Sequence, residues 1–345
     1  MAHRDFLTWL FYSKPMIAPW SDLRHAQSRR LPIFSEYTQA LVFQLGRQRL
    51  FPGYRFAVHI LTVFVLSVSP MTLFGQEAEL DDTTFELDVM TFNIRTSDGQ
   101  DGDNIWPLRK ELVVDTIRAF EPDVLGLQEA LTVQIDFLQS EMPEYRWLGV
   151  DRGLNGGVGL SEATPIFYKH EVLVPIESGT FWLGDDTNPP TQRGRVARIV
   201  TWARFHHLEA LRQFYVYNTH FTIRGGSRQI QSAEQINARI AQHPPEGVVV
   251  VLGDFNAIAE TSETWHAATS DGLRDAWVVA EKQEGPPLTS NGFGPPPEGR
   301  EGRIDWILVG GPVTVERAVT VLHSVDGRWP SDHYPVAAEL VVRSR

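Results

Sequence analysis

Cysteine is absent from this chain of 345 residues. The absence excludes disulfide bonds, a thiolate nucleophile and zinc or iron–sulfur sites held by cysteine. The chain also lacks a His-Glu-x-x-His segment, the spacing with which a helix presents two histidines to zinc. The adjacent pair His206 and His207 is expected to be solvated surface at a strand-to-loop boundary.

Basic residues are scarce beyond the first part of the chain. The formal net charge is −12, and residues 1–75 hold eight Lys or Arg against three Asp or Glu, so the remainder carries −17. A body this acidic does not bind nucleic acid through a broad basic face, because phosphate neutralisation needs clustered Lys and Arg. A polyanionic substrate would therefore need a local positive centre, which a bound divalent metal ion could supply.

One long apolar run lies near the N-terminus, at residues 56–74. It follows Arg55 and precedes Gly75 and a polar stretch, an order typical of a signal peptide. A run of this length also just spans a bilayer, so an uncleaved membrane anchor is the alternative. We expect residues 1–75 to be an N-terminal extension that exports the protein to the periplasm or the extracellular space, or else anchors it.

Beyond Gly75, strand-like and helix-like segments alternate without a linker long enough to separate domains, which predicts one domain. Apolar alternation and short apolar runs predict strands at 85–94, 122–130, 165–174, 198–205, 214–221, 247–257, 304–310 and 334–342. Helical spacing predicts helices at 106–120, through 137–138, and at 227–243, the last capped by Ser227. The Pro- and Gly-rich residues 285–303 are predicted to form a loop.

Several of the predicted strands begin or end in acids, amides or histidines. In packed α/β folds, strand ends present catalytic groups from a rigid scaffold. One such residue would more often be a turn former, but six strand ends of this kind in one chain indicate a shared site. The residues are Asn93, Glu129, Asn218, His220, Asp254, Asn256, Asp305, Asp332 and His333.

Oxygen ligands dominate this set. The carboxylates of Glu129 and Asp332 and the amide of Asn93 suit Mg²⁺, which commonly binds through one or two carboxylates, waters and substrate phosphate oxygens. Mn²⁺ and Ca²⁺ are the alternatives. Ser331, between Pro330 and Asp332, is expected to be only a turn residue.

Six segments in a fixed order carry a resemblance to a known family. They are TFNIRTSDG, LGLQEA, YNTHF, LGDFNA, RIDWILV and SDHYPV. Together they resemble the endonuclease/exonuclease/phosphatase family of metal-dependent phosphoesterases, over residues 85–342. The resemblance implies a catalytic domain with the α/β fold of a four-layer sandwich, in which two mixed β-sheets pack face to face with helices on the outside.

The resemblance also implies roles for individual residues. Glu129 would be the principal Mg²⁺ ligand, with Asn93 and Asp332 nearby. His333 would act as general base or hydrogen-bond partner at the reacting phosphate, held in orientation by Asp305.

Further positions would act on the phosphate itself. Asp254 and Asn256 would position the attacking water and the phosphate, while His220 would stabilise phosphate oxygens or assist the leaving group, paired with Glu162. Phosphate contacts are also expected from the arginines Arg95, Arg195 and Arg198, although a surface ion pair is an equal alternative for the last two.

Departures from the family pattern narrow the substrate. Arg95 stands where abasic-site endonucleases carry an acid, and Leu131 stands where deoxyribonuclease carries a groove-reading arginine. The closest resemblance is to exported bacterial members. We expect an exported, nuclease-like phosphoesterase that acts as a monomer without an obligate protein partner. A lipid or sugar-phosphate phosphoesterase is the alternative, and a catalytically silent binding module is disfavoured because no expected site position has been replaced.

Overall fold

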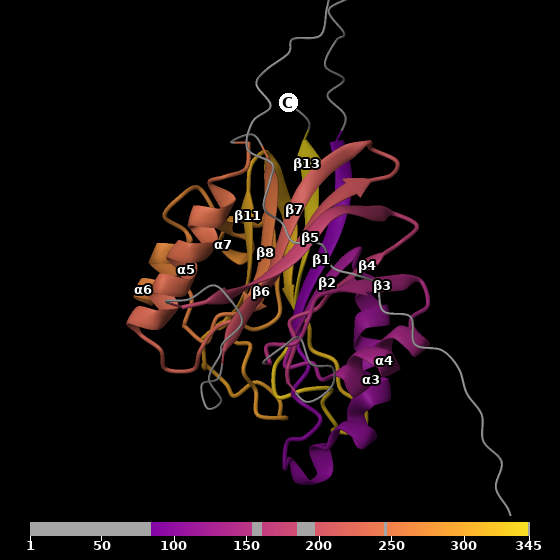
Figure 1. The fold of residues 1–345 in the computed structure, drawn as a ribbon. Coiled ribbons are helices and arrows are strands. Elements are labelled where there is room, and N and C mark those ends of the chain that lie inside the picture. The colour runs from indigo at the N-terminus through magenta and orange to yellow at the C-terminus, as the bar shows by residue number, and fades with distance from the viewer. Residues whose placement is uncertain (1–83, 154–160, 185–196, 245–246, 344–345) are drawn as a thin grey trace, which may run out of the picture. The chain divides into compact units, whose positions relative to one another are not determined.

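The computed structural model describes residues 84–153, 161–184, 197–244 and 247–343 (Figure 1). These residues belong to one unit, residues 75–345. The predicted N-terminal extension with its apolar run lies outside the described residues, as does Arg195. Within the described ranges, no helix is both long and apolar enough to cross a membrane.

Two mixed β-sheets form the centre of this unit. The first has the order β10 (Lys282–Glu284), β12 (Val313–Thr320), β13 (Val336–Arg343), β1 (Thr84–Asn93), β2 (Val124–Gln128), β4 (Ile166–Lys169) and β3 (Tyr145–Leu148). The second has the order β5 (Leu173–Leu183), β6 (Arg198–His207), β7 (Arg212–His220), β8 (Val248–Asp254), β11 (Asp305–Gly310) and β9 (Arg274–Asp275). The first sheet contains two parallel pairs, β1 with β2 and β10 with β12, and the second contains one, β7 with β8; the other neighbours are antiparallel.

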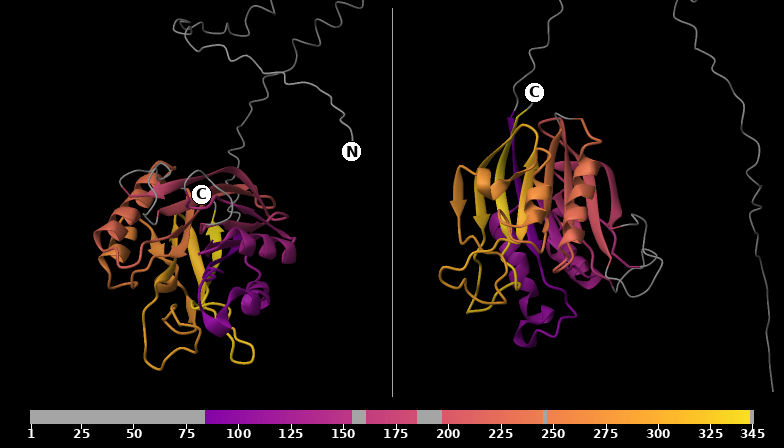
Figure 2. Two further views of the ribbon diagram at one scale, coloured as in Figure 1. Left: turned by 60° about the horizontal axis from the view of Figure 1, so that its bottom comes forward. Right: turned by 90° about the vertical axis from the view of Figure 1, so that its left-hand side faces the viewer.

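Helices cover the outer faces of the sheets (Figures 1 and 2). Near the first sheet lie the short 3₁₀ turn η1 (Gly102–Asn104) and the helices α3 (Trp106–Phe120) and α4 (Thr132–Glu141). Near the second lie α5 (Ser227–Ile240) and α6 (Glu263–Ala268), with the short α7 (Ala276–Val279) beside β11. The expected four-layer α/β sandwich is therefore confirmed.

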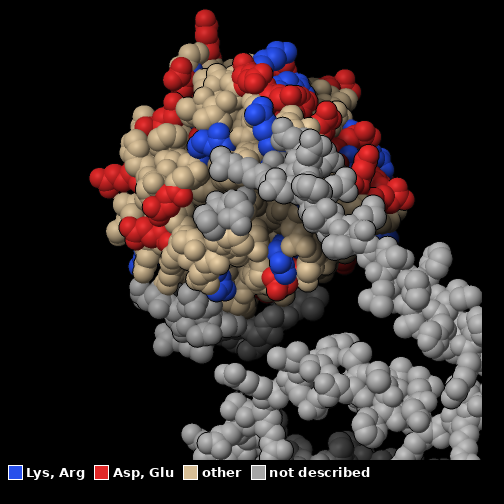
Figure 3. Space-filling model, turned by 90° about the horizontal axis from the view of Figure 1, so that it is seen from above, with Lys and Arg blue, Asp and Glu red and all other residues tan. Residues whose placement is uncertain are grey.

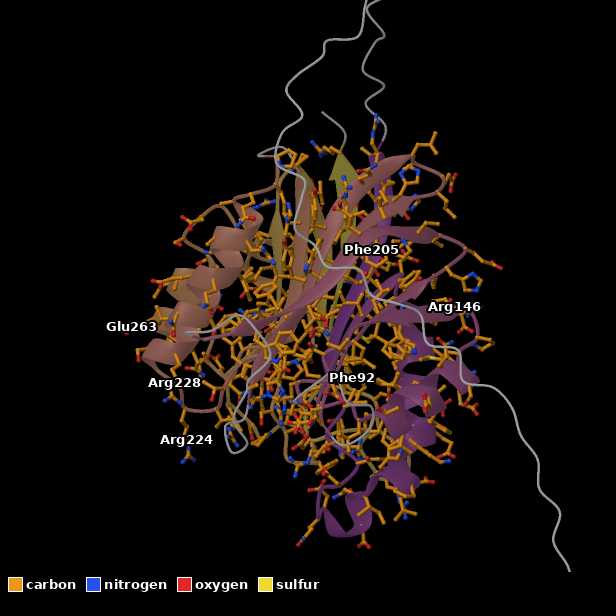
Figure 4. All side chains as sticks on the ribbon, viewed as in Figure 1. Phe92, Arg146, Phe205, Arg224, Arg228 and Glu263 are labelled. Atoms are coloured by element: carbon orange, nitrogen blue, oxygen red, sulfur yellow. The ribbon has the colours of Figure 1, made fainter. Side chains whose placement is uncertain are left out.

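The alternation of side chains along each strand builds three apolar cores. On β1, Leu87 and Val89 enter the core between the sheets, whereas Met90 and Phe92 pack beneath α3 and α4. On β8, the valines alternate between the inter-sheet core and the core beneath α5. The prediction that this valine run is buried on both faces is confirmed, and Figure 4 shows Phe205 of β6 and Phe92 within the sandwich while Arg146 lies at its edge.

Three local expectations are wrong. Residues 165–174 are not one strand: β4 ends at Lys169, a turn follows, and the chain crosses to the other sheet at β5. Helix α5 begins with Gly226 as its N-cap at φ 45°, and Ser227, already within the helix, makes no cap bond. His207 is buried rather than solvated, because the last residue of β6 points inward and its ring packs 4.6 Å from that of Phe85.

A polar bridge joins the two sheets close to the site. Gln128 at the end of β2 donates from Nε2 to Oδ1 of Asn218 on β7 at 2.7 Å, and Asn218 donates back to the carbonyl of Leu127 at 2.9 Å. A Cβ at Gly126 would lie 2.7 Å from Asn218 Oδ1, so a larger residue would collide with the bridge. Asn218 is therefore a structural link between the sheets.

Candidate active site

The polar residues of the six motifs meet at one edge of the sandwich. Strands β1, β2, β7 and β8 end at this edge, which lies toward the bottom of Figure 1, whereas the antiparallel β11 and β13 begin there. The register pairs Asp305 directly with Asp254 across β11 and β8. The structure therefore brings the polar strand ends together, as predicted, because the sheet topology directs these strand ends to one edge.

A buried histidine–carboxylate pair lies at the centre. Nδ1 of His333 is 2.9 Å from Oδ2 and 3.2 Å from Oδ1 of Asp305, and Asp305 is fully buried. Burial of the imidazole opposes its protonation, but the carboxylates of Asp305 and Asp254 outweigh burial and raise the pKa of His333 well above its ordinary value. Asp305 thus orients the ring, leaves Nε2 for a reacting group and makes that nitrogen more basic.

Asp254 connects this pair to the acidic side of the site. Its Oδ1 accepts a hydrogen bond from the backbone N–H of Asn256 at 2.9 Å, and its Oδ2 accepts one from Nδ2 of Asn93 at 3.0 Å. Burial, followed by the charge of Asp305, raises the pKa of Asp254 above its usual range. The side chain of Asn256 donates to the carbonyl of Phe221 at 3.0 Å, so the carboxylate and amide are held rigidly.

Glu129 and Asn93 form the acidic side. Nδ2 of Asn93 also donates to Oε1 of Glu129 at 3.2 Å, and Oε2 of Glu129 accepts the backbone N–H of Thr96 at 3.1 Å. Asp332 is close, because the guanidinium of Arg95 lies within 4 Å of both acids: 3.8 Å from Glu129 and 3.9 Å from Asp332. The predicted metal-ligand residues are therefore brought together.

Two groups of side chains could hold a metal ion. The first is the predicted set of Glu129, Asn93 and Asp332, whose acids keep 14% and 24% side-chain exposure. The second comprises Asp254, Asp305 and His333, whose ligand atoms lie within 4.8 Å of one another. In the second set, the carboxylates of Asp254 and Asp305 are buried at 1% and 0% exposure, and Nδ1 of His333 is already bonded to Asp305. The first set fits Mg²⁺ better, because its hard oxygens are partly exposed and leave room for retained waters.

Arg95 is engaged with acids in this structure. Its Nε and Nη2 donate to the two carboxylate oxygens of Asp101 at 3.0 and 2.9 Å, and this bond raises the pKa of the guanidinium above its ordinary value. Its predicted role in phosphate binding stays a prediction. The guanidinium is the positive charge that Glu129 and Asp332 share among the described residues.

Arg109 is a site-supporting residue that sequence reasoning missed. It lies on α3, is only 2% exposed, and donates to the carbonyl oxygens of Ile94, Arg95 and Pro330 at 2.5, 2.6 and 2.9 Å. Burial lowers the pKa of its guanidinium to about 10. Arg109 therefore ties the loop after β1 to the segment before Asp332; its only sequence signal was an arginine on the apolar face of a predicted helix.

Ser331 does more than form a turn. It is fully buried, and its Oγ donates to the carbonyl of Asn93 at 2.6 Å while accepting the backbone N–H of His333 at 3.3 Å. The expectation of a simple turn residue is wrong, because the fold carries this segment across the end of β1. The predicted loop 285–303 contains no helix or strand, and Asn291 donates its backbone N–H to the carbonyl of Asp332 at 2.8 Å.

His220 opens onto a small recess beside the buried pair. The recess is lined in part by Arg152, Glu162, Arg198 and His220, with a volume of about 10 Å³, enough for one water-sized atom. The expected Glu162–His220 pair is not formed: Glu162 binds Arg152 at 2.7 Å, and Nε2 of His220 lies 3.4 Å from Asp254 without hydrogen-bond geometry. Arg152 lies nearer to the carboxylate and neutralises it.

Unsatisfied donors make the recess suited to an anion. Nε and Nη1 of Arg198 are buried and find no acceptor in the described part of the chain. Burial, followed by the charges of Arg198 and Arg152, lowers the pKa of His220 well below its ordinary value. Burial likewise lowers the pKa of Arg198 to about 10. The guanidinium groups of Arg152 and Arg198 face the single carboxylate of Glu162. One phosphoryl oxygen would therefore accept hydrogen bonds from the Arg198 donors that otherwise stay unpaired.

Three residues of the site adopt left-handed backbone conformations. Arg95, Glu129 and Asn256 have φ values of 54°, 59° and 50°. Non-glycine residues rarely adopt this backbone region because it is sterically strained. Such strained residues cluster at sites where the backbone orients a functional group. At Arg95 and Asn256 the backbone N–H donates to the side chain two residues earlier, which stabilises the turn.

Comparisons with known proteins agree with this geometry. The profile of the Endonuclease/Exonuclease/phosphatase family matches residues 90–333. A solved endonuclease/exonuclease/phosphatase from Bacteroides vulgatus is 32% identical, with 74% of this chain and 98% of that chain covered and a TM-score of 0.69. A mannosyl-6-phosphatase from Bacteroides thetaiotaomicron is 26% identical, with 74% and 99% covered and a TM-score of 0.67.

A curated viral relative matches over a shorter stretch. An uncharacterized protein of Acanthamoeba polyphaga mimivirus is 23% identical over 168 residues, which are 44% of this chain and 59% of that protein. The family profile, which covers more than half of the chain, and the 32% identical structure together establish the class. The chain belongs to the endonuclease/exonuclease/phosphatase family, whose members are hydrolases of phosphoester bonds.

Proposed function

We propose that this protein is an exported, Mg²⁺-dependent phosphoesterase that hydrolyses its substrate by direct attack of water. One observation carries the proposal: the His333–Asp305 pair, Asp254 and the Glu129–Asn93 group form one hydrogen-bonded cluster at the meeting point of the strands. Such a cluster combines a proton acceptor with oxygen ligands for a divalent ion.

Each part of the cluster has a distinct task. His333, oriented by Asp305, accepts the proton of the attacking water at Nε2. Asp254 and Asn256 position that water and the phosphoryl group, and His220 donates to a phosphoryl oxygen. Mg²⁺ held by Glu129, Asp332 and Asn93 would neutralise negative charge on the phosphoryl oxygens.

Positive charge near the site is local rather than extended. Arg152 and Arg198 line one small recess, while Arg224 and Arg228 lie at the outer edge near α5 (Figure 4). On the opposite end of the sandwich, acidic and basic side chains are interspersed in the part that Figure 3 shows. Nucleic acid is bound through extended basic tracks, so a small phosphate ester suits this distribution better than a polymer.

The mannosyl-6-phosphatase relative supports the same preference. Export is proposed from the apolar run 56–74, which is followed by a small residue and a polar stretch. Mass spectrometry of the N-terminus of the protein recovered from outside the cytoplasm tests cleavage near Gly75. Recovery of the intact chain from the cytoplasm alone would overturn this part of the proposal.

Activity is tested with the purified protein on plasmid DNA, RNA, sphingomyelin and small phosphate esters, with Mg²⁺ or EDTA. We expect hydrolysis of at least one small ester that EDTA abolishes. His333→Ala and Glu129→Ala should each remove it without loss of the folded structure. Activity that survives both substitutions would contradict the site assignment, and failure on every substrate would favour a binding module.

A further inference from the structure

A second, larger groove lies beside the recess at His220. It has a volume of about 350 Å³ and is lined by the segment after β3, by one face of β5 and by Thr201 of β6. Thr164, which lines the recess, lies with its Oγ1 3.4 Å from Oγ1 of Thr201. The buried pair of Thr164 and Thr201 therefore lies between the two hollows, and the groove is of the size typical of small-molecule sites.

The strand alternation of β5 explains which side chains face the groove. Phe181 packs into the core beneath α5, so its neighbours Thr180 and Trp182 point to the other face, as does Ser178. Thr180 is paired with Thr201 on the adjacent strand. The groove is thus lined by the hydroxyl groups of Ser178 and Thr180 and by one indole ring, while the neighbouring Thr201 is buried.

A glycine keeps the facing wall clear. Gly149 has φ 132°, and a Cβ there would lie 3.1 Å from Oγ1 of Thr201. Any other residue would be strained and would crowd the hydroxyl. The indole of Trp182 lines the groove, and its Nε1 is buried without an acceptor among the described residues.

The lining favours one class of occupant. Its described lining residues include no Lys or Arg that could pair with the further phosphates of a nucleic acid. Its hydroxyls do not suit a lipid chain, because each would lose its hydrogen bonds to water. Hydroxyls that can donate and accept, beside an aromatic ring, match the alternating polar and C–H surfaces of a sugar.

We propose that this groove binds the sugar moiety of a hexose phosphate while the phosphoryl group reaches the recess at His220. Thr180 and Trp182 would then be specificity-determining residues, in direct contact with the sugar. The inference rests on the proposed phosphoesterase function and extends it to a substrate class.

The test compares sugar and alkyl phosphates. We expect Thr180→Val and Trp182→Leu to lower kcat/KM for the preferred hexose 6-phosphate about tenfold, mainly through KM, because each removes one sugar contact. Glucose, mannose and galactose 6-phosphate are the sugars, and ethyl phosphate is the reference, whose kcat/KM should stay within about twofold. Thr314→Val on β12, at the other end of the first sheet, is the matched control and should change neither value.

Binding supplies a second readout that does not need turnover. Calorimetric titration of each hexose 6-phosphate into the EDTA-treated full chain should show affinity that Thr180→Val weakens about tenfold. Equal losses on sugar and ethyl phosphate, or no loss on either, would overturn the groove assignment. So would the absence of any preference for a hexose phosphate over ethyl phosphate.

Failure of the two proposals gives different results. Mg²⁺-dependent hydrolysis of ethyl phosphate or bis(p-nitrophenyl) phosphate without hexose preference would leave the phosphoesterase function standing and reject the groove. Binding of a hexose phosphate that depends on Thr180 and Trp182, with no ester hydrolysed, would reject the phosphoesterase function and support the groove.

Discussion

Around Glu129, the carboxylates of Asp101, Glu129 and Asp332 share one guanidinium, whereas around His333 the imidazole is bonded to Asp305, with Asp254 nearby. The first side keeps partial exposure, and the second is almost completely closed to solvent. An exposed acidic group can exchange ions and waters, while a buried hydrogen-bonded group has a fixed geometry. The site thus separates an ion-exchanging side from a rigid proton-handling side, and Asn93 bonds to both.

The largest effect is expected on the rigid side. Asp305→Asn preserves size but removes the charge that orients and polarises His333, so kcat/KM for the best phosphate ester should fall by about 10³-fold to 10⁴-fold. Steady-state kinetics at saturating Mg²⁺ measures the loss. The exposed Asp326→Asn is the matched control, and a loss below about tenfold would show that the pair is not used as proposed.

Substitution of Arg109 tests whether the ion-exchanging side and the rigid side of the site depend on the same supporting residue. Arg109→Met leaves at least three carbonyl groups without their donor, so the free energy of unfolding should fall by about 3 kcal/mol. Urea denaturation followed by circular dichroism measures it. Arg228→Met, at an exposed position of α5, should change stability by less than about 0.5 kcal/mol. Equal stability of the two variants would contradict the support role.

The ion-exchanging side should respond through metal affinity. Glu129→Gln keeps the shape but loses the carboxylate, so the Mg²⁺ concentration for half-maximal activity should rise about 10-fold to 100-fold. Mg²⁺ titrations of activity and of binding measure it, with the exposed Glu141→Gln as control. If Glu129→Gln left the Mg²⁺ requirement unchanged, the ion would be bound elsewhere. If only Asp254→Asn raised the Mg²⁺ requirement, the buried set of Asp254, Asp305 and His333 would be favoured as the metal site.

A smaller effect is expected at Asp88, which lies on β1 away from the site. Burial, followed by the charges of Asp123 and Glu339, raises the pKa of Asp88 to about 6. A raised carboxyl pKa means that the folded state binds the proton more tightly, so stability falls as pH rises from about 4 to about 6 and stays lower above. Asp88→Asn should therefore stabilise the protein by roughly 1 kcal/mol at pH 8, after allowance for solvent screening, and have little effect at pH 4.

Thermal unfolding at the two pH values measures this difference. Asp115→Asn, at an exposed position of α3, serves as the control. Stabilisation by Asp88→Asn at pH 4 and not at pH 8 would reverse the sign and reject the assignment.

The sequence was sufficient to predict the central elements, but not β3, β12, α6 or α7, which lie outside every expected range. Periodicity located β1, α3 and β8, and the ordered motifs predicted the family and the convergence of Glu129, Asp254 and His333. It was not sufficient to predict pairing. Glu162 was assigned to His220, but the fold places Arg152 beside it, and Arg152 stands in a segment with no motif of its own.

The residues themselves determined which groups could do chemistry: cysteine is absent, and carboxylates, amides and imidazoles stand at the strand ends. Tertiary structure decided which of these groups meet. Arg109 and Ser331 became supports of the site because segments more than 200 residues apart cross at the end of β1. Local patterns report hydrophobic period and turn chemistry, whereas a buried charge finds its partners only when distant strands pack, and that packing is a property of the whole chain.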